Sequence, residues 1–481
     1  MRRVLWLSLF LLWGLHAASA QTPPAFYAIG DPALLEIWVD GANGSDSSSG
    51  ESRDQALATI SAAWARIPQT MTNTGYAIRV LPGQYPAESL PNYWESRHGT
   101  FEYPILIEAV EGRDTVTFST VNIFDVRYLY FVNINFSAEN DPFHCEACQY
   151  LLLRGVRVSG ADPETYATQE AVKINQSQHI YIEDSDISGA WDNAVDFVAV
   201  QHGHALNNRI HRAGDWCMYA KGGSADFLIE NNEFYDCGTG GFTAGQGTGF
   251  QFMVPPWIQY EAYDIRFINN IVHDTQGAGV GVMGGFNILI AGNTFYRVGE
   301  RSHVLEVAFG SRSCDGLLGD EGRERCDQFR EAGGWGGSQV DDGENYVRIP
   351  NRHVFIYNNV IYNPPGFQSA YQQFFIPAPY GQQPGTNVSA PALADDDLQI
   401  RGNIIWNGSA EMPLGIEANP DSPAGCQADN PTCNQAQLRA DNLINQVEPV
   451  MVDPENGNFD LLPGIALPTQ PIPEFTQHAP A

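Results

Sequence analysis

Short segments of alternating apolar and polar residues recur along most of the chain, and each ends in a small polar corner. Ile180–Ile187, Phe227–Phe234 and Val354–Ile361 are examples. The corner positions are Ile134, Val156, Ser185, Asn208, Asn232, Asn270, Asn293, Asn359 and Asn403, and the closest of them follow one another after 22, 23, 24 and 23 residues. Such a period is typical of a β-solenoid, whose turns must stack to bury their apolar faces. The pattern predicts an all-β fold, a single-stranded right-handed parallel β-helix of roughly 10–13 turns.

Asn is the commonest residue at these corners. Its side chain tolerates left-handed backbone and can hydrogen-bond to the backbone of a stacked neighbour. We therefore expect the Asn side chains to connect successive turns.

The first 76 residues lack the repeat. Residues 1–20 combine two arginines, an apolar run from Val4 to Leu15 and the small residues Ala18–Ala20, which is the pattern of a secretory signal peptide. The apolar run is too short to span a bilayer. In residues 21–76 we expect a strand from Ile37 and a helix near Leu57–Ile67 that caps the open end of the solenoid. The protein is therefore expected to be secreted, extracellular or periplasmic, without a membrane span.

The repeats place the β-helix at residues 77–410. Two stretches interrupt it: residues 311–349 are rich in Gly and acidic residues, and residues 364–397 are rich in Pro, Gln and aromatic residues. Loops of this length in a compact fold are usually functional or disordered. Residues 411–481 are expected to form a C-terminal loop and tail region.

The eight cysteines fit an oxidising compartment. Their spacing predicts four disulfides, namely Cys145–Cys148, Cys217–Cys237, Cys314–Cys326 and Cys426–Cys433. Cys217 and Cys237 lie nearly one turn apart, so they could join adjacent turns. A zinc site is the alternative for the C-x-x-C at Cys145, although no second pair has the matching spacing.

The formal net charge of −31 opposes binding to nucleic acid. It also opposes long-range attraction of a polyanion, unless a local cationic patch or a bound metal reverses the field. Acidic surfaces are also common in secreted proteins, so the charge by itself selects no function. We expect a monomer whose partner is a polysaccharide.

The two ends of the predicted fold resemble a known family. The opening from Trp38 to Gly50 and the closing Asp-Pro-Glu-Asn-Gly-Asn-Phe-Asp-Leu-Leu-Pro-Gly from Asp453 look like the ends of secreted bacterial right-handed parallel β-helix proteins. That family includes polysaccharide lyases and many relatives without an assigned function. The resemblance spans nearly all of the chain after residue 20, and it implies the fold more strongly than any chemistry.

The chain has only two lysines, Lys173 and Lys221, against 23 arginines. Counting back from the corners puts Asn175, Gln201, Lys221 and Met283 at equivalent outward positions. Lys173 and Tyr219 lie two residues upstream and therefore on the same face. Lys differs from Arg because its pKa can fall far enough for it to act as a base. The alternative is that both lysines are ordinary surface residues.

The segment Tyr219–Ser224, with the sequence Tyr-Ala-Lys-Gly-Gly-Ser, resembles the segment that carries the base lysine in β-helix polysaccharide lyases. The resemblance implies that Lys221 removes the proton α to a uronate carboxylate, with Tyr219 and Arg212 as further catalytic candidates. The carboxylate must be neutralised for this reaction. In those lyases calcium held by acidic residues commonly does so, which makes Asp192, Asp196 and Asp215 the candidate ligands here. Capping of turns is the alternative role for these aspartates.

Other polar and aromatic residues near Lys221 in the sequence could bind a sugar polymer. They are Lys173, Asn175, Gln201, His202, His204, Gln246, Trp257 and Tyr260. The His-x-His spacing places both imidazoles on one face of a strand, which suits a metal or acid catalysis. Sugars stack on aromatic rings, although many solenoid aromatics belong to the core.

Three functions are compatible with these features. The first is a polysaccharide lyase that cleaves a uronic-acid polysaccharide by β-elimination with a lysine base. The second is a noncatalytic polysaccharide-binding or surface protein that uses the same groove. The third is a glycoside hydrolase, which needs two carboxylates roughly 5 Å or 6.5–9.5 Å apart. Asp196 and Asp215 are the candidate pair.

Overall fold

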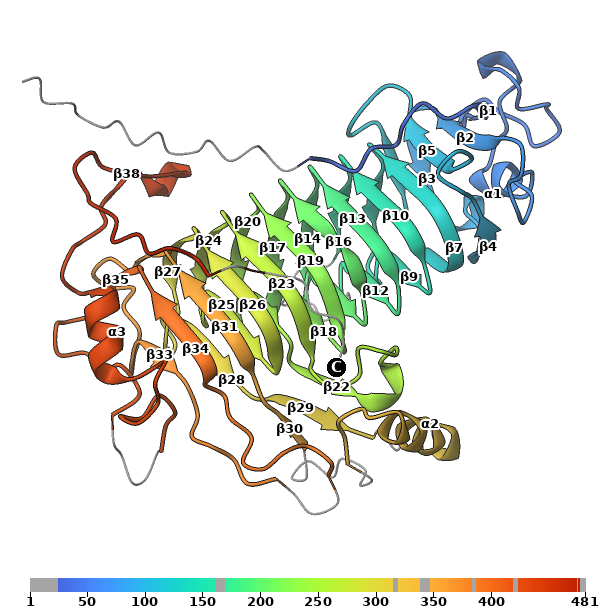
Figure 1. The fold of residues 1–481 in the computed structure, drawn as a ribbon. Helices are drawn as coiled ribbons and strands as arrows, with labels where there is room; N and C mark the ends of the chain where they lie inside the picture. The colour runs from blue at the N-terminus through green and yellow to red at the C-terminus, as the bar shows by residue number, and fades with distance from the viewer. Residues whose placement is uncertain are drawn as a thin grey trace, which may run out of the picture.

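The computed structural model describes residues 25–160, 169–314, 319–337, 347–382, 386–417, 423–473 and 475. The predicted signal peptide lies outside these residues. The described chain winds as a parallel β-helix in which a full turn contributes three strands, so that equivalent strands form three stacks (Figure 1). The predicted fold class is confirmed.

Each strand pairs in parallel with the equivalent strands before and after it, and β7 belongs to both stack 1 and stack 2. Stack 1 consists of β4 (Trp94–His98), β7 (Val121–Val132), β9 (Phe143–Glu146), β12 (Val172–Asn175), β15 (Val195–Val198), β18 (Trp216–Lys221), β21 (Gly240–Ala244), β25 (Val280–Met283), β28 (Leu305–Ala308) and β33 (Phe374–Phe375). Stack 2 consists of β1 (Leu34–Val39), β2 (Gly75–Val80), β5 (Ile105–Ala109), β7, β10 (Gln149–Arg154), β13 (Gln178–Glu183), β16 (Gln201–Leu206), β19 (Ser224–Glu230), β23 (Ala262–Ile268), β26 (Gly285–Ala291), β31 (Arg352–Tyr357) and β34 (Asp396–Arg401).

Stack 3 is a separate sheet of 12 strands, one for each turn that reaches it. It consists of β3 (Gly83–Tyr85), β6 (Val116–Phe118), β8 (Asn135–Ser137), β11 (Arg157–Ser159), β14 (Asp186–Ala190), β17 (Arg209–Ala213), β20 (Glu233–Cys237), β24 (Ile271–Thr275), β27 (Thr294–Val298), β32 (Val360–Tyr362), β35 (Ile404–Trp406) and β36 (Leu443–Ile444). The inward residues of all three stacks form one continuous apolar core from Ile37 to Ile444.

The corner residues form a buried hydrogen-bonded ladder. The backbone N–H of Asn208 donates to the amide oxygen of Asn232 at 2.9 Å, Asn232 donates to Asn270 at 2.9 Å, and Asn270 donates to Asn293 at 2.8 Å. The ladder continues through Asn359 and Asn403 to Asn442. The predicted contact between turns is confirmed. The left-handed backbone, however, falls on the residue before each ladder position from Asn208 to Asn403, as at Asn207 and Asn231.

We expect Asn270→Ala to destabilise the protein by about 2–3 kcal/mol. The substitution leaves the buried N–H of Asn232 and the carbonyl oxygen of Ile229 without their partner, and each buried group left unsatisfied costs about 1–3 kcal/mol. Thermal or urea unfolding checks this. Asn43→Ala, on an exposed loop, should change stability by less than about 0.5 kcal/mol, and an equal loss in both variants would contradict a structural role for the ladder.

The N-terminal end carries a helix shorter than expected. The predicted helix near Leu57–Ile67 is reduced to the five residues of α1 (Ile60–Trp64). Its buried residues Ile60, Ala63 and Trp64 join the core cluster. That it caps the solenoid stays a prediction. Single-turn helices occur at η1 (Arg53–Gln55), η2 (Ala87–Ser89), η3 (Phe250–Phe252) and η5 (Pro454–Asn456).

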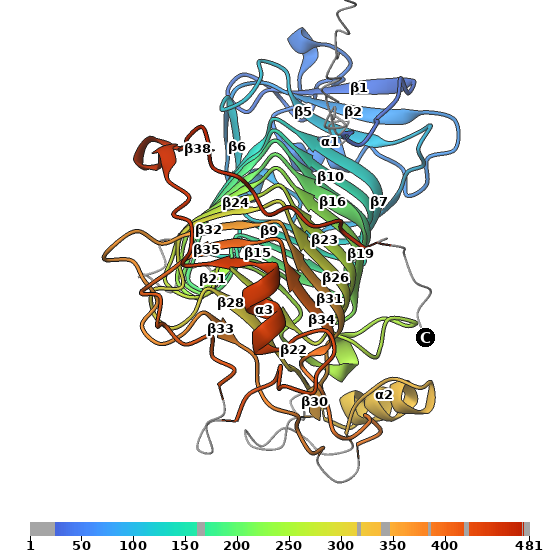
Figure 2. The ribbon, with the colours of Figure 1, turned by 60° about the vertical axis from the view of Figure 1, so that its left-hand side comes forward.

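The 311–349 stretch leaves the stacks after β28. Its described parts lie in β29 (Gly310–Ser313), α2 (Gly319–Glu331) and β30 (Val347–Ile349). Strand β29 pairs in parallel with β22 (Gly247–Gly249) and antiparallel with β30. Figures 1 and 2 both show these elements beside β22 and outside the three stacks.

Part of the 364–397 stretch returns to the β-helix. It contains β33, which pairs with β28, and the first residues of β34. The C-terminal part of the chain also forms α3 (Gln435–Asp441) and the hairpin of β37 (Met451–Asp453) and β38 (Asn458–Leu461) (Figure 1). Phe459 of β38 packs with Tyr296 and Tyr362 of stack 3. No helix among the described residues is long and apolar enough to cross a membrane.

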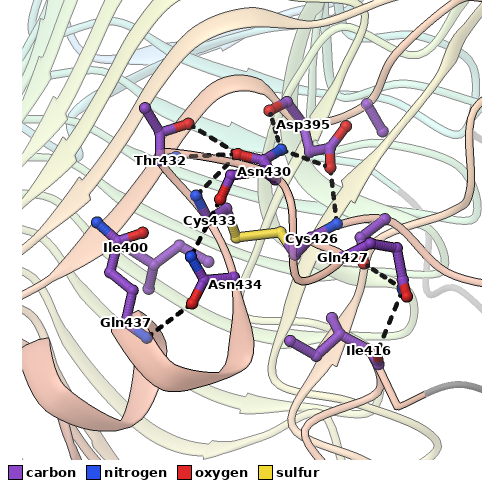
Figure 3. Close-up of a disulfide and its surroundings, with 12 residues drawn as sticks. Asp395, Ile400, Ile416, Cys426, Gln427, Asn430, Thr432, Cys433, Asn434 and Gln437 are labelled. Carbon is purple, nitrogen blue, oxygen red and sulfur yellow. Dashed lines mark hydrogen bonds between the residues drawn. A yellow bond between two sulfur atoms is a disulfide. The ribbon is translucent and has the colours of Figure 1, made fainter.

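All four predicted disulfides are present. The Cα atoms of Cys217 and Cys237 lie 5.5 Å apart, and this bond joins β18 to β20 within the core. Cys426–Cys433 closes a C-terminal loop whose Cys426 N–H donates to Asp395 (Figure 3). Disulfide formation at Cys145–Cys148 removes the zinc alternative for this pair. Four disulfides are typical of proteins outside the reducing cytosol, whereas secretion itself stays a prediction.

Candidate functional site

Two outward rows of side chains cross β12, β15 and β18 of stack 1. In the first row Lys173 lies beside Asp196, and Asp196 lies beside Tyr219. In the second row Glu146, Asn175, Val198 and Lys221 follow one another. The rows lie two residues apart in each strand, so they share one face, because alternate residues of a strand point the same way. The prediction that Lys173 and Tyr219 occupy equivalent positions is confirmed.

A pocket of about 380 Å³ opens over these rows. Its floor comes from stack 1, and one wall comes from the loop that carries β22 and η3. The lining residues are Glu146, Gln169, Glu170, Lys173, Asn175, Gln176, Asp192, Asp196, Val198, Tyr219, Lys221, Gly247, Thr248, Gly249 and Phe252. Both lysines of the chain therefore line one pocket.

Lys173 is held by two carboxylates. Its Nζ lies 2.9 Å from Glu170 Oε1 and 3.5 Å from Asp196 Oδ2, and both carboxylates are about 2% exposed. Burial by itself lowers the pKa of Lys173, but the charges of Asp196 and Glu170 outweigh burial and raise it. Lys173 is thus a fixed cation rather than a base.

Three groups of the pocket, Glu170, Asp192 and Tyr219, have raised pKa values. Burial raises the pKa of Glu170, and the neighbouring charge of Asp196 raises it further. Burial and the charges of Asp215 and Asp196 raise the pKa of Asp192. The Tyr219 phenol is almost fully buried, and burial together with Asp196 raises its pKa well above the usual range. Tyr219 is therefore a neutral phenol at ordinary pH.

The raised pKa of Glu170 makes stability depend on pH. Above about 4.5, the ordinary value, the unfolded chain releases this proton while the folded protein retains it, so stability falls as pH rises. We expect Glu170→Gln to remove this loss, so that between pH 5 and 8 its melting temperature falls by about 2 °C less than that of the wild type. Melting curves across this range check it. The exposed Glu88→Gln serves as control, and parallel curves for all three proteins would contradict the prediction.

Lys221 has a different environment from Lys173. Its Nζ donates to Gln246 Oε1 at 3.1 Å and lies 4.2 Å from the centre of the Tyr219 ring. Among the described residues no carboxylate lies within ion-pair distance of it. The Gln246 amide nitrogen in turn lies 3.5 Å from Asp215 Oδ2. Lys221 therefore faces the pocket with a neutral amide and an aromatic ring as its contacts.

Several predicted site residues lie elsewhere. The prediction that Gln201 lies in the same row as Lys221 is wrong, because Val198 occupies that position. Gln201 instead begins β16, and its side-chain amide donates to the carbonyl oxygen of Gly223. Arg212 lies on β17 of stack 3 and does not line the pocket. Trp257 and Tyr260 belong to a second, buried apolar cluster.

The two histidines of the His-x-His segment also lie outside the pocket. His202 Nδ1 contacts Asp226 at 3.1 Å, whereas His204 Nε2 contacts Glu183 at 2.6 Å. His202 has a positive φ of 62° within β16, which breaks the regular alternation of side chains between His202 and His204. The two imidazoles therefore contact different carboxylates, and the predicted joint role in one site is not supported.

The three aspartates proposed as calcium ligands do not come together as a set. Asp192 and Asp196 line the pocket, but Asp215 does not. Within the described parts of the chain, no group of three or more His, Cys, Asp or Glu side chains is arranged to hold a metal ion. The Lys173 ammonium already lies against Asp196. We derive no step through a bound ion, and calcium binding stays a prediction.

Sequence reasoning missed Glu146, Glu170 and the wall residues Gly247–Phe252. Glu146 precedes Asn175 by 29 residues, and the corner Val156 precedes the corner Ser185 by the same number. Aligning the two turns by their corners could therefore have identified Glu146. Glu170 lies in a loop just before β12 and carries no periodic signal. The wall comes from the glycine-rich segment after β21, whose path the repeat does not define.

The chain contains a right-handed β-helix. A family model described as "Right handed beta helix region" matches residues 143–305, which include the strands of the pocket. A search of curated proteins gave no match.

Solved structures with similar folds include carbohydrate-active enzymes at low identity. The chain is similar to the pectate lyase Pel9A, with 15% identity over 58% of this chain and 76% of that chain and a TM-score of 0.34. It is also similar to a rhamnogalacturonan lyase, with 12% identity over 84% and 98% and a TM-score of 0.43. The A-module of the Azotobacter vinelandii mannuronan C-5 epimerase AlgE6 has 14% identity over 75% and 92% and a TM-score of 0.35. We take no argument about the pocket from similarities this distant.

Proposed function

We propose that the protein is a carbohydrate-active enzyme, a polysaccharide lyase that cleaves a uronic-acid polysaccharide by β-elimination with Lys221 as the base. The observation that carries the proposal is the contrast between the two lysines of one pocket. Two carboxylates hold Lys173, while Lys221 contacts an amide and a ring. The resemblance of Tyr219–Ser224 to the base-carrying segment of β-helix lyases supports the same assignment.

In this reaction unprotonated Lys221 Nζ takes the proton α to the uronate carboxyl group. The electron pair left behind forms a carbon–carbon double bond as the glycosidic C–O bond at the β carbon breaks. The leaving oxygen then takes a proton. Tyr219 is a suitable donor because its phenol is neutral and lines the pocket. Arg212, which lies outside the pocket, has no part in this proposal.

The substrate carboxylate needs compensating positive charge as the carbanion develops. Lys173 is the other cationic side chain among the described residues that line the pocket. The raised pKa of Glu170, about 8, reduces the negative charge that an anionic sugar would meet. These features favour a uronate despite the acidic composition of the whole protein.

Incubation with a panel of pectate, alginate and glycosaminoglycans tests the proposal, with product masses as the readout. Elimination gives an unsaturated product that is lighter by one water than the hydrolysis product. The panel is run with added calcium and with a chelator, which also tests the predicted cofactor. Polysaccharide retained without any product would favour the noncatalytic binding protein.

A glycoside hydrolase is the second candidate. Glu170, with its raised pKa, and Asp196 form the kind of carboxyl pair in which one member is poised to donate a proton. This pair replaces the predicted Asp196–Asp215 pair, because Asp215 lies outside the pocket. Products that gain the elements of water would identify this activity.

A further inference from the structure

A buried ion pair lies behind the wall of the pocket. Arg312 of β29 and Glu261, which directly precedes β23, both have fully buried side chains. Arg312 Nε donates to Glu261 Oε1 at 2.9 Å, and Nη2 donates to the same oxygen. Removing two charges from water costs several kcal/mol per ion unless further hydrogen bonds satisfy both groups. The other hydrogen-bond partners of Glu261 and Arg312 show which segments of the site this ion pair holds together.

The second oxygen of Glu261 holds two segments of the pocket. Glu261 Oε2 accepts from the backbone N–H of Gly222 at 3.1 Å and from Thr248 Oγ1 at 2.5 Å. Gly222 follows Lys221 directly, and Thr248 lies in the wall strand β22. One carboxylate therefore links the turn after Lys221 to the opposite wall.

The turn after Lys221 depends on such a restraint. Gly222 and Gly223 have positive φ values of 65° and 82°, in a region that glycine enters without strain. A double-glycine turn is permissive, so its own backbone does little to fix the residue before it. The Gly222 N–H bonds the Glu261 carboxylate, and the Gly223 N–H bonds the Glu261 backbone oxygen at 2.9 Å.

Arg312 connects this carboxylate to the 311–349 stretch. Its guanidinium donates to the backbone oxygen of Trp335 at 2.8 Å and to those of Ile258 and Gln259 at 3.4 and 3.3 Å. It also pairs in register with Thr248, because β29 runs parallel to β22 (Figure 1). Strand β29 thus reaches the pocket wall through its pairing with β22 and through the buried Arg312 side chain.

We propose that Arg312 is a positioning residue of the site. Through Glu261 it fixes the turn after Lys221 against the pocket wall, so strand β29 is part of the functional site. The inference rests on the proposed function, since Lys221 is the group that is positioned.

The double variant Glu261→Met/Arg312→Met tests the inference. Replacing a buried ion pair with apolar residues of similar volume is often neutral for stability, so the fold should persist while the link is lost. We expect kcat to fall by about 10²-fold, because a small misplacement of a reacting group has effects of this size. KM should change by less than about threefold, since the sugar-contacting side chains are unaltered.

A second readout needs no substrate. The chain has only two lysines, so acetylation by an N-hydroxysuccinimide ester, followed by peptide mass spectrometry, reports each of them separately. We expect the rate at Lys221 to change at least about threefold in the double variant. The rate at Lys173 should be unchanged, because its own ion pairs are intact.

Asp274→Asn/Arg297→Met, which removes an ion pair between β24 and β27 of stack 3, is the matched control and should alter neither readout. A folded Glu261→Met/Arg312→Met protein with wild-type kcat and wild-type Lys221 labelling would overturn the inference. If that protein does not fold, Thr248→Val and Arg312→Lys are measured in the same way, and wild-type values in both would overturn it. If the protein proves not to be a lyase, the acetylation rate at Lys221 alone tests whether Arg312 positions this residue.

Discussion

Replacing Lys221 with Ala is expected to lower the rate of product formation by about 10²–10⁴-fold, which is the usual contribution of a general base. The fold should persist, because Lys221 points outward and, among the described residues, its Nζ hydrogen-bonds only to Gln246. Initial rates on the substrate identified from the panel, together with a melting curve, check both statements.

Two further substitutions separate basicity from charge. Lys221→Arg retains the positive charge but should be as inactive as Lys221→Ala, since a guanidinium does not release its proton in a protein. Lys221→Met retains the length and apolar contacts of the stem and should also be inactive. Full activity in the Arg variant would show that Lys221 acts through charge and not as a base.

Removing the other lysine should chiefly affect stability. We expect Lys173→Met to cost about 3–5 kcal/mol at neutral pH, because it leaves the buried Asp196 carboxylate beside Glu170 without its cation. Because the raised pKa of Glu170, about 8, keeps this group mostly protonated at both pH 7 and pH 5, the loss should be similar at the two pH values. Urea unfolding at pH 7 and pH 5 measures both effects.

Arg79→Met is the matched control for Lys173→Met. Arg79 also bridges two carboxylates on neighbouring turns, those of Glu36 and Glu108, but these are 43% and 29% exposed. Exposed pairs contribute about 0–1 kcal/mol, so Arg79→Met should lose far less stability. Equal losses in the two variants would mean that burial of Glu170 and Asp196 does not set the cost.

The fold could be predicted because its signal is repeated. Each turn supplies apolar residues at alternate positions and a polar corner, so errors in any one turn leave the period intact. The Asn ladder from Asn208 to Asn403 followed from that register, and only its continuation to Asn442 was missed. The four disulfides followed from spacing and compartment.

The pocket was only partly predictable, because turns vary in length. Lys221 and Ala225 lie four residues apart, whereas the equivalent Val198 and Gln201 lie three apart, since the turn after Lys221 contains an additional glycine. Gln201 lies only seven residues before the corner Asn208, whereas Asn175 and Met283 lie ten before theirs, so the corner register itself indicates Val198 rather than Gln201. Glu170 and Thr248 come from loops, which no period describes.

The ion pair of Arg312 with Glu261 illustrates the same limit. Arg312 is a charged residue in a strand, and its side chain is fully buried. Its partner lies 51 residues earlier in the chain, and only the pairing of β22 with β29 brings the two segments together.

Chemical rescue of Lys221→Ala by small primary amines tests most directly whether Lys221 takes the proton. The account predicts that added ethylamine restores formation of the unsaturated product in proportion to its concentration, and that more basic amines of similar size restore more. Guanidinium at the same concentration should restore nothing. Equal rescue by guanidinium and amine, or no dependence on amine basicity, would contradict the assignment of Lys221 as the base.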